Sequence, residues 1–258
     1  ALIKLYKEGT KQIKDGEINY SFRIFSYLKK GKEVKEYSIG MKEKFLVDMK
    51  IAINDDQDVI CVGFYADISN YYTNYDGSFF MAIDRDTREI KAKNFKEFDL
   101  DFFKSNLSAK GKQKANKKAD KGENLAFSNY DLKNIVFRDD GGVVLIAELS
   151  FVTYLTYKDG TTTTFYHKGS IIVVNINSKG NIEWNKSINK MQKSYNMDWY
   201  TSYALAVVND KLYFVFYDNI KNKHANPNQK VYDINNVSKE GTIAVVSFDA
   251  EGNEKWEF

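Results

Sequence analysis

The sequence predicts an all-β protein assembled from repeated four-stranded antiparallel units. Three observations predict this fold class. Short apolar runs alternate with turns rich in Asn, Asp and Gly, one longer pattern recurs along the chain, and the 258 residues include 18 Tyr and 18 Phe. Aromatic side chains favour strands because they pack well on a pleated, half-buried surface. A single proline leaves Gly, Asn and Asp to form the turns.

The recurring pattern is a glycine, an apolar strand, a polar turn and a second strand. Its copies open at Gly77, Gly169 and Gly241. The last two copies align without gaps, because Gly180 and Gly252 each fall 11 residues after the opening glycine. Trp184 and Trp256 then follow these turn glycines by four residues each. The first copy is looser and lacks both the turn glycine and the tryptophan.

A second hairpin precedes each copy. These hairpins span 50–64, 134–148 and 204–218, and each joins two apolar strands through a turn that contains Asn or Asp. Two hairpins in series give four antiparallel strands, the unit of which β-propeller blades are built. The sequence therefore predicts a β-propeller with three clear blades and a partial one. The blades span about 1–44 (partial), 45–97, 132–190 and 203–258, with an insertion at 98–131.

The predicted blades form a single propeller domain, 1–258, or a fragment of one. A hairpin that begins at Phe22 forms the outer half of the first blade, and residues 2–20 could complete it to give a ring of four. Alternatively, the residues are one part of a larger propeller. We favour the larger propeller because the first repeat is weak.

The turns of the recurring pattern carry a family resemblance. Asp249, Gly252 and Trp256 follow a pattern of Asp, then Gly or Thr three residues on, then Trp, and Asp84 and Thr87 follow it less closely. Over most of residues 22–258 the chain resembles propellers with pyrroloquinoline-quinone-like or related repeats. It also resembles uncharacterised bacterial cell-envelope proteins with such repeats, which implies a place in the periplasm or on the outer-membrane surface. The quinone-binding residues find no match, so no cofactor is expected.

We interpret these turns as structural. Asp accepts backbone N–H bonds in a tight turn, Gly supplies positive φ, and Trp fills the wedge between adjacent blades. The acidic stretches 84–86 and 249–252 superficially suggest calcium. Neither has the 12-residue ligand series ending in Glu that an EF-hand loop requires.

The insertion combines a helix with a basic run. Phe98, Phe102, Phe103 and Leu107 recur near helical spacing and predict a short helix within 96–107. Six lysines follow between residues 110 and 121. We favour a solvated, mobile loop for this run over an electrostatic contact with phosphate, acidic glycan or membrane headgroups.

Long connecting segments carry the candidate functional residues. In a blade, the connectors between hairpins and between blades emerge at one end, and the tight turns at the other. Residues 149–168 alternate apolar and polar side chains around Lys158, Asp159 and Gly160, which predicts a projecting hairpin. The candidate binding face consists of aromatic residues in these connectors: Tyr71, Tyr72, Tyr75, Tyr154, Tyr157, Tyr166, Tyr195, Trp199, Tyr200 and Tyr203.

This face suits a protein interface, or sugar rings, because aromatic rings stand beside amide and hydroxyl groups. The alternative is that the tyrosines simply cover extended sheets. We predict a non-enzymatic binding or scaffolding module of a bacterial cell envelope that contacts a partner protein. The alternative is a carbohydrate-binding or carbohydrate-processing propeller.

Other classes of function lack support in the sequence. A net charge of +3 argues against a nucleic-acid binder, and no apolar run is long enough for a membrane span. Cys61 lies in an apolar run and is expected to be buried. His167 and His224, both expected to be exposed, do not make a metal site, and the Asp139–Asp140 pair falls in a tight turn. No nucleophile-elbow signature supports an enzyme.

Overall fold

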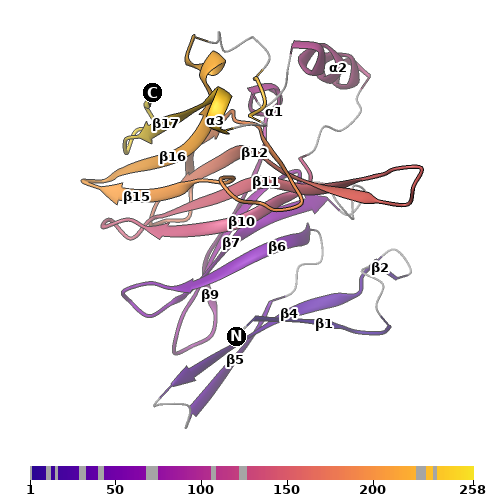
Figure 1. Ribbon diagram of the computed structural model, residues 1–258. Coiled ribbons are helices and arrows are strands. Elements are labelled where there is room, and N and C mark those ends of the chain that lie inside the picture. The colour runs from indigo at the N-terminus through magenta and orange to yellow at the C-terminus, as the bar shows by residue number, and fades with distance from the viewer. Residues whose placement is uncertain are drawn as a thin grey trace. The chain divides into compact units, whose positions relative to one another are not determined.

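The computed structural model describes residues 2–9, 13–14, 17–28, 33–39, 44–67, 75–105, 109–121, 127–224, 231–234 and 237–258. Strands dominate these residues, which confirms the predicted all-β character (Figure 1). The chain divides into two compact units, Ala1–Glu97 and Phe98–Phe258. The boundary coincides with the end predicted for the second four-stranded repeat. Each unit is described by itself.

The first unit contains two main sheets, and all their strand pairs are antiparallel. The first sheet joins β1 (Leu2–Tyr6), β4 (Tyr20–Leu28) and β5 (Glu33–Ile39). The short strands β2 (Ile13–Lys14) and β3 (Glu17–Ile18) pair with each other. The second sheet has the predicted order of four consecutive strands: β6 (Lys44–Ile53), β7 (Val59–Asp67), β8 (Gly77–Ile83) and β9 (Ile90–Glu97).

The second unit contains two further antiparallel sheets. The third sheet is formed by β10 (Tyr130–Phe137), β11 (Val143–Thr156), β12 (Thr162–Ile176) and β13 (Ile182–Ile188), and β14 (Gln192–Tyr195) also pairs with β12. The fourth sheet is formed by β15 (Ala204–Val208), β16 (Lys211–Asn219), β17 (Gly241–Phe248) and β18 (Glu254–Glu257). Short helices η3 (Ile220–His224) and α3 (Val237–Glu240) lie between β16 and β17 in the chain. The predicted four-strand order is thus confirmed in the second, third and fourth sheets.

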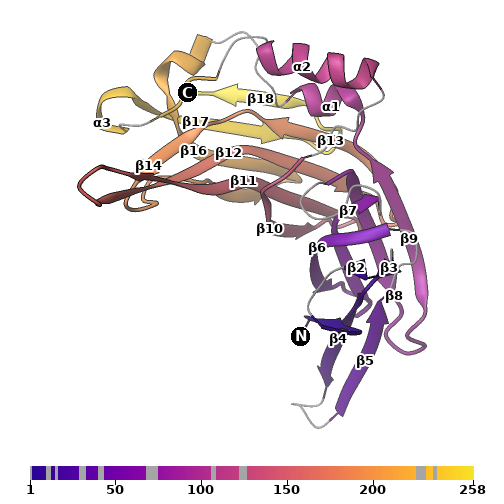
Figure 2. The ribbon, with the colours of Figure 1, turned by 90° about the vertical axis from the view of Figure 1, so that its right-hand side faces the viewer.

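Sheets stack face to face within each unit. In the second unit, Ile146 and Val173 of the third sheet share one apolar core with Phe214 and Val246 of the fourth sheet. Figure 2 shows these two sheets stacked on each other. In the first unit, Phe22 and Ile24 of the first sheet share a core with residues of the second sheet. Cys61 is fully buried in that core, as predicted. Successive side chains of a strand point to opposite faces of the sheet, so every second side chain faces the same neighbouring sheet. Apolar residues at these alternate positions form the cores.

The turn chemistry predicted from the recurring pattern is confirmed. The Asp84 carboxylate accepts backbone N–H bonds from Asp86 and Thr87, both at 2.8 Å. Asn177 takes the same role in the next copy, and Asp249 in the last. Gly180 and Gly252 both have φ of +81°. Side chains other than glycine rarely adopt that conformation, so the turn glycines are required by the backbone.

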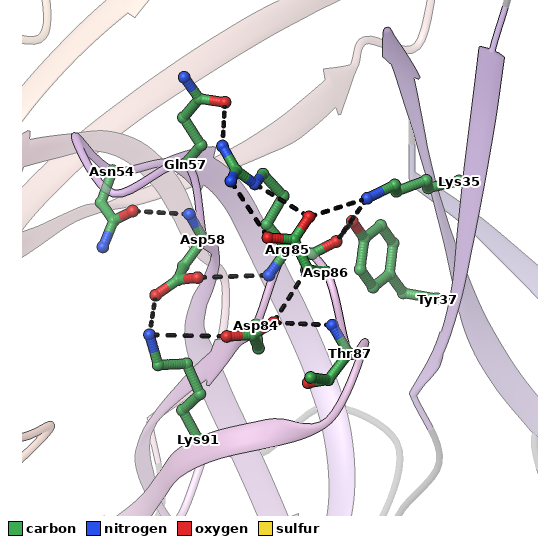
Figure 3. A network of polar contacts seen from close by, with 10 residues as sticks. All are labelled: Lys35, Tyr37, Asn54, Gln57, Asp58, Asp84, Arg85, Asp86, Thr87 and Lys91. Carbon is green, nitrogen blue, oxygen red and sulfur yellow. Dashed lines mark hydrogen bonds and ion pairs between the residues drawn. The ribbon is translucent and has the colours of Figure 1, made fainter.

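A carbonyl of the tight turn is held by the preceding sheet in both units. The indole N–H of Trp184 on β13 donates to the Ala250 carbonyl at 2.9 Å, so Trp184 fills the wedge between the third and fourth sheets. In the first unit the corresponding turn carbonyl, that of Arg85, accepts hydrogen bonds from Lys35 at 3.0 Å and from Tyr37 at 3.3 Å. Figure 3 shows both side chains of β5 directed at this turn.

Buried Asp58 braces the same turn of the first unit from its own sheet. Its carboxylate accepts the Arg85 backbone N–H at 3.3 Å and the Lys91 ammonium at 2.7 Å (Figure 3). The Asn54 side chain in turn accepts the backbone N–H of Asp58 at 2.8 Å. Side chains from two strands and two turns therefore fix this end of the second sheet.

Trp256 differs from its predicted equivalent Trp184. A register shift in the third sheet, between Asn175 and Ile176, places Trp184 opposite Asn175. The fourth sheet has no such shift, and Trp256 lies opposite Val246. Because side chains alternate along a strand, a difference of one residue turns Trp256 to the opposite face. Its ring packs against Phe216 of its own sheet, with centroids 6.1 Å apart.

The insertion between the second and third sheets is helical. The predicted short helix is present as α1 (Leu100–Ser105), and Phe98, Phe102, Phe103 and Phe127 form an aromatic cluster around it. The favoured interpretation of the lysine run as a mobile loop was wrong, because residues 109–120 form α2 (Ala109–Asp120). Ala, Lys and Gln all have high helix propensity, which explains the difference.

Candidate functional site

The candidate site is built on a hairpin that extends beyond the third sheet. Strands β11 and β12 stay paired from Ser150 and Lys168 out to Thr156 and Thr162, after a register shift near Glu148. Figure 1 shows this hairpin projecting from the rest of the second unit. The turn at its tip contains Gly160 at φ of +85°. The predicted projecting hairpin is therefore confirmed.

Strand β14 widens the hairpin to three strands and brings further aromatic residues to it. Tyr195 of β14 pairs with Phe165 of β12. The segment that follows β14 carries Trp199 and Tyr200. The side chains of Tyr154, Tyr195, Trp199 and Tyr200 are between 60% and 70% exposed, which is unusual for rings of this size. Tyr154 pairs with Thr164 and Tyr195 pairs with the next residue, Phe165, so these two rings lie on opposite faces of the hairpin. We name the four exposed residues, with Tyr157 and Met197, the aromatic hairpin surface, which includes both faces.

One face of the hairpin holds ordered contacts between aromatic and charged groups. The His167 ring stacks on Phe151 with centroids 4.4 Å apart, and its Nε2 lies 2.9 Å from the Thr153 hydroxyl. The Lys193 ammonium lies 4.1 Å from the centre of the Phe165 ring. Burial, and then the charge of Lys193, lower the pKa of His167. His167 was expected to be exposed, but it is half-buried within β12.

Tyr75, Tyr166 and Tyr203, which were also predicted for the binding face, are less exposed than these residues. Tyr75 belongs to the first unit, where it is buried and stacked on Phe64 at 4.9 Å, so it is a core residue. Tyr166 is half-buried on β12. Tyr203 packs on Phe214, and its hydroxyl donates to Asn134 at 3.0 Å. Tyr71, Tyr72 and the side chain of His224 lie outside the described residues.

A buried ion pair lies at the base of the hairpin. The Lys190 ammonium is 2.6 Å from Glu148 Oε1, and both side chains have no exposed surface. The other Glu148 oxygen accepts the Ser202 hydroxyl at 2.7 Å. Lys190 also donates to the Gln192 side chain at 3.0 Å. Burial lowers the pKa of Lys190 to about 8, although the Glu148 carboxylate acts in the opposite direction.

Gln192 connects this ion pair to the segment that carries Trp199 and Tyr200. Its side-chain oxygen accepts the Ser202 backbone N–H at 2.7 Å, and its amide donates to the Ser202 carbonyl at 3.2 Å. The same amide donates to the Tyr217 carbonyl at 2.8 Å. Tyr200 and Ser202 have φ of +60° and +69°. These left-handed conformations are unfavourable for non-glycine residues, and the two hydrogen bonds to Gln192 help to hold Ser202 in its own.

Buried Asp218 lies near the same cluster. Its carboxylate accepts the Asn219 backbone N–H at 2.8 Å and the Asn222 side chain at 2.7 Å. Burial raises the pKa of Asp218, whereas these two hydrogen bonds favour its charged form. The only local mark of this cluster in the sequence is the charged residue at the end of the apolar run 143–147. Partners such as Glu148 and Lys190, far apart in the chain, meet only through sheet packing.

A groove of about 290 Å³ lies at the tight-turn end of the third and fourth sheets. Its lining is apolar at Val136, Val144, Val207 and Leu212 and polar at the turns. Arg138 forms ion pairs with Asp140 and Glu183, at 2.6 and 2.7 Å. The Asp139–Asp140 pair lies in a tight turn, as predicted. These groups hold one another and the turn.

Among the described residues, no group of three or more His, Cys, Asp or Glu side chains is arranged to hold a metal ion. In the described part of the chain, no helix has the length and apolar character to cross a membrane. In the comparisons with known proteins, the chain matches no protein-family model and no curated protein.

Proposed function

We propose that the chain is a non-enzymatic protein-binding module, built on a propeller-type scaffold, that contacts its partner through the aromatic hairpin surface. The observation that carries this proposal is the exposure of Tyr154, Tyr195, Trp199 and Tyr200 on adjoining segments of one unit. Trp, Tyr and Met are enriched in protein interfaces, and a few such residues supply most of the binding energy.

The way these residues are held supports a binding role. Strand pairing fixes Tyr154 and Tyr195, and Gln192 holds Ser202, which follows Trp199 and Tyr200 in the chain. A surface ordered before binding loses less conformational entropy when the partner arrives. The exposed rings are therefore better suited to recognition than rings on a freely moving loop.

The propeller-type scaffold is supported by the repeat and by how the sheets stack. Three sheets share the order of four consecutive strands, and in each unit a turn carbonyl of the later sheet is held by the earlier sheet. Blades of a propeller stack in this sequential way. A place in a bacterial cell envelope is proposed from the sequence resemblance alone.

Site-specific photo-crosslinking in the native host tests the proposed interface. A photoreactive phenylalanine derivative replaces Tyr154 or Trp199, and Ile90 serves as the control because it is 47% exposed on a strand of the other unit. We expect the same discrete protein adduct from both test positions and none from the control. Adducts of equal yield at all three positions, or none at Tyr154 and Trp199, would contradict the proposal.

Carbohydrate binding is the second candidate, favoured by the hydroxyl groups beside the exposed rings. Thr153, Thr156 and Thr162 line the same hairpin as Tyr154, and the last two lie with their hydroxyls 3.1 Å apart. A glycan array probed with the wild type and with Trp199→Ala separates the candidates. Selective glycan binding that is lost in the variant would favour the carbohydrate-binding protein.

A further inference from the structure

The part of β11 that extends beyond the third sheet is an edge strand. Strand β10 pairs with β11 only as far as Leu149. Asn129 extends this pairing by one hydrogen bond, because its carbonyl accepts the Ser150 backbone N–H at 2.8 Å. From there to the end of β11, β12 is the only strand paired with it within the described residues. We name this segment, residues 150–156, the open edge of the hairpin.

Alternate residues of the open edge direct their backbone N–H and C=O groups away from β12. In an antiparallel pair of strands, two opposite residues either exchange both hydrogen bonds or exchange none. The Thr164 carbonyl accepts the Asn196 backbone N–H at 2.8 Å, so the backbone groups of Thr164 are directed away from β11. Tyr154 lies opposite Thr164, and its backbone groups are therefore directed away from β12. Val152 and Thr156, two residues to either side, have the same orientation.

The outward backbone groups of these three residues have no hydrogen-bond partner in the described part of the chain. At the opposite edge of the hairpin, by contrast, Ile234 covers part of the chain at β14. Its N–H donates to the Met191 carbonyl at 3.1 Å, and its carbonyl accepts the Lys193 N–H at 3.2 Å. The edge at β11 therefore presents a row of free donors and acceptors, which is a template for pairing with another strand.

The sequence of the open edge lacks the features that protect such strands. Charged side chains, proline and bulges normally guard an edge strand, since its free backbone groups otherwise pair with other chains. Residues 150–156 read SFVTYLT, contain no charged residue and no proline, and keep a regular register with β12. The edge strands β9 and β18 of the second and fourth sheets, in contrast, each carry several charged residues. The composition of the open edge favours a strand that pairs on both sides, because aromatic and β-branched residues favour strands.

We propose that the open edge binds an extended segment of the partner protein, which adds a strand to the hairpin beside β11. Strand addition at an exposed sheet edge is a recurring mode of peptide recognition, in which backbone hydrogen bonds supply the affinity. The side chains beside the added strand are Val152 and Tyr154 on one face and Phe151 and Leu155 on the other. The partner segment is therefore an uncharged strand of aromatic and β-branched residues, which pair well with these across strands. The proposal rests on the proposed function and names how the partner meets the hairpin.

Amide hydrogen exchange of the isolated chain, followed by NMR, tests whether the edge is open. The N–H groups of Thr153 and Leu155 bond to β12, whereas those of Val152 and Tyr154 face outward. We expect the outward pair to exchange at least about tenfold faster than the bonded pair. Equally slow exchange at every concentration would show that the chain itself covers the edge. Slow exchange that appears only as the concentration rises would show that a second copy covers it, and either result overturns the proposal.

Two variants at Val152 test whether the partner uses the edge. Val152→Pro removes an outward N–H and places the proline ring beside the added strand, while the pairing of β11 with β12 does not use that N–H. Val152→Ala is the matched control, because it shortens the side chain and keeps the N–H. With the photoreactive residue at Tyr154 in the native host, Val152→Pro should lower the yield of the protein adduct by about tenfold or more. Val152→Ala should retain most of the adduct, and circular dichroism verifies that both variants are folded.

The outcomes separate this proposal from the proposed function. An undiminished adduct in Val152→Pro, or an equal loss in Val152→Ala, would overturn strand addition and leave the partner contact at the hairpin in place. The absence of any adduct from Tyr154 and Trp199 without a change at Val152 would contradict the proposed function, and strand addition with it. If Val152→Pro does not fold, Thr156→Pro and Thr156→Ala provide the same comparison, because the Thr156 N–H also faces outward.

Discussion

The Lys190 ammonium lies 2.6 Å from the Glu148 carboxylate with both side chains fully buried. Removing both groups from water is costly, and their attraction repays it only with good geometry and further hydrogen bonds. The Ser202 hydroxyl donates one such hydrogen bond to Glu148, and the Gln192 side-chain oxygen accepts another from Lys190. The ion pair is therefore a link between the end of the third sheet and the segment that carries Trp199.

Removing one partner of this ion pair should destabilise the protein more than removing both charges. Lys190→Met leaves the Glu148 carboxylate buried without its cation, and we expect a loss of about 3–5 kcal/mol in the free energy of unfolding. The double variant Glu148→Gln with Lys190→Met keeps an acceptor for Ser202 and should lose less. Urea unfolding of the single and double variants measures the difference. Equal losses would show that Glu148 does not depend on Lys190.

The ion pair should also give stability a distinctive pH dependence. The pKa of Lys190 is about 8 in the folded protein against 10.5 for an ordinary lysine. Between these values the unfolded chain binds more protons, so this group makes the folded state more stable as pH rises. Relative to the double variant, the wild type should gain up to about 3 kcal/mol between pH 8 and 10.5.

The double variant serves as the reference because it retains the buried tyrosines and Cys61. Burial raises the pKa of Cys61 to about 12, so this thiol lowers stability as pH rises above its usual range. That contribution cancels in the comparison. A difference between the two proteins that is flat across this pH range would show that Lys190 titrates normally.

Trp184 and Gly252 should behave as a coupled pair. A Cβ at Gly252 would lie 2.9 Å from the Trp184 ring, and the backbone there has φ of +81°. Gly252→Ala should therefore cost about 2 kcal/mol or more, partly from strain and partly from the collision. Trp184→Ala should cost about 3 kcal/mol. In the double variant the collision is relieved, so thermal or urea melts should show less than the sum of the two losses.

The exposed and buried tyrosines should separate clearly in stability. Tyr154→Ala and Tyr157→Ala remove exposed rings and should change the free energy of unfolding by within about 0.5 kcal/mol. Tyr75→Ala removes a ring stacked on Phe64 and should cost about 3 kcal/mol or more. The measurement is chemical denaturation of the three variants. A large loss from Tyr154→Ala would place that ring in the core and remove the basis for the aromatic hairpin surface.

Local chemistry made the sheets predictable from the sequence. The tight turns at Asp84, Asn177 and Asp249 form through hydrogen bonds between residues a few positions apart. The local sequence of each turn is therefore enough to locate the two strands that flank it. The projecting hairpin was predictable for the same reason, because alternation on both sides of Gly160 is local. The lysine run was wrongly predicted to be a loop, because its high charge conceals the strong helix propensity of Ala, Lys and Gln.

The candidate site was predictable only in part, because tertiary packing decides which rings are exposed. Tyr75 and Tyr154 both stand in connecting segments, yet one is stacked on Phe64 and the other projects into solvent. The opposite orientations of Trp184 and Trp256 depend on a register shift that leaves no mark in the aligned repeats. Gln192 was missed because its partners, Ser202 and Tyr217, are backbone groups brought together by folding.

The tight turns at Arg85 and Ala250 should tolerate inserted residues less well than the hairpin tip near Gly160, because another sheet holds the carbonyl of each turn. An added residue near Ala250 would move a carbonyl that Trp184 must reach from another sheet, so length is constrained there. The hairpin tip near Gly160 extends beyond the sheet, and a side chain at that glycine would meet no other atom within 4 Å. Grafted peptides and new recognition loops should therefore be accepted at the hairpin tip near Gly160 and rejected at the turns near Gly252.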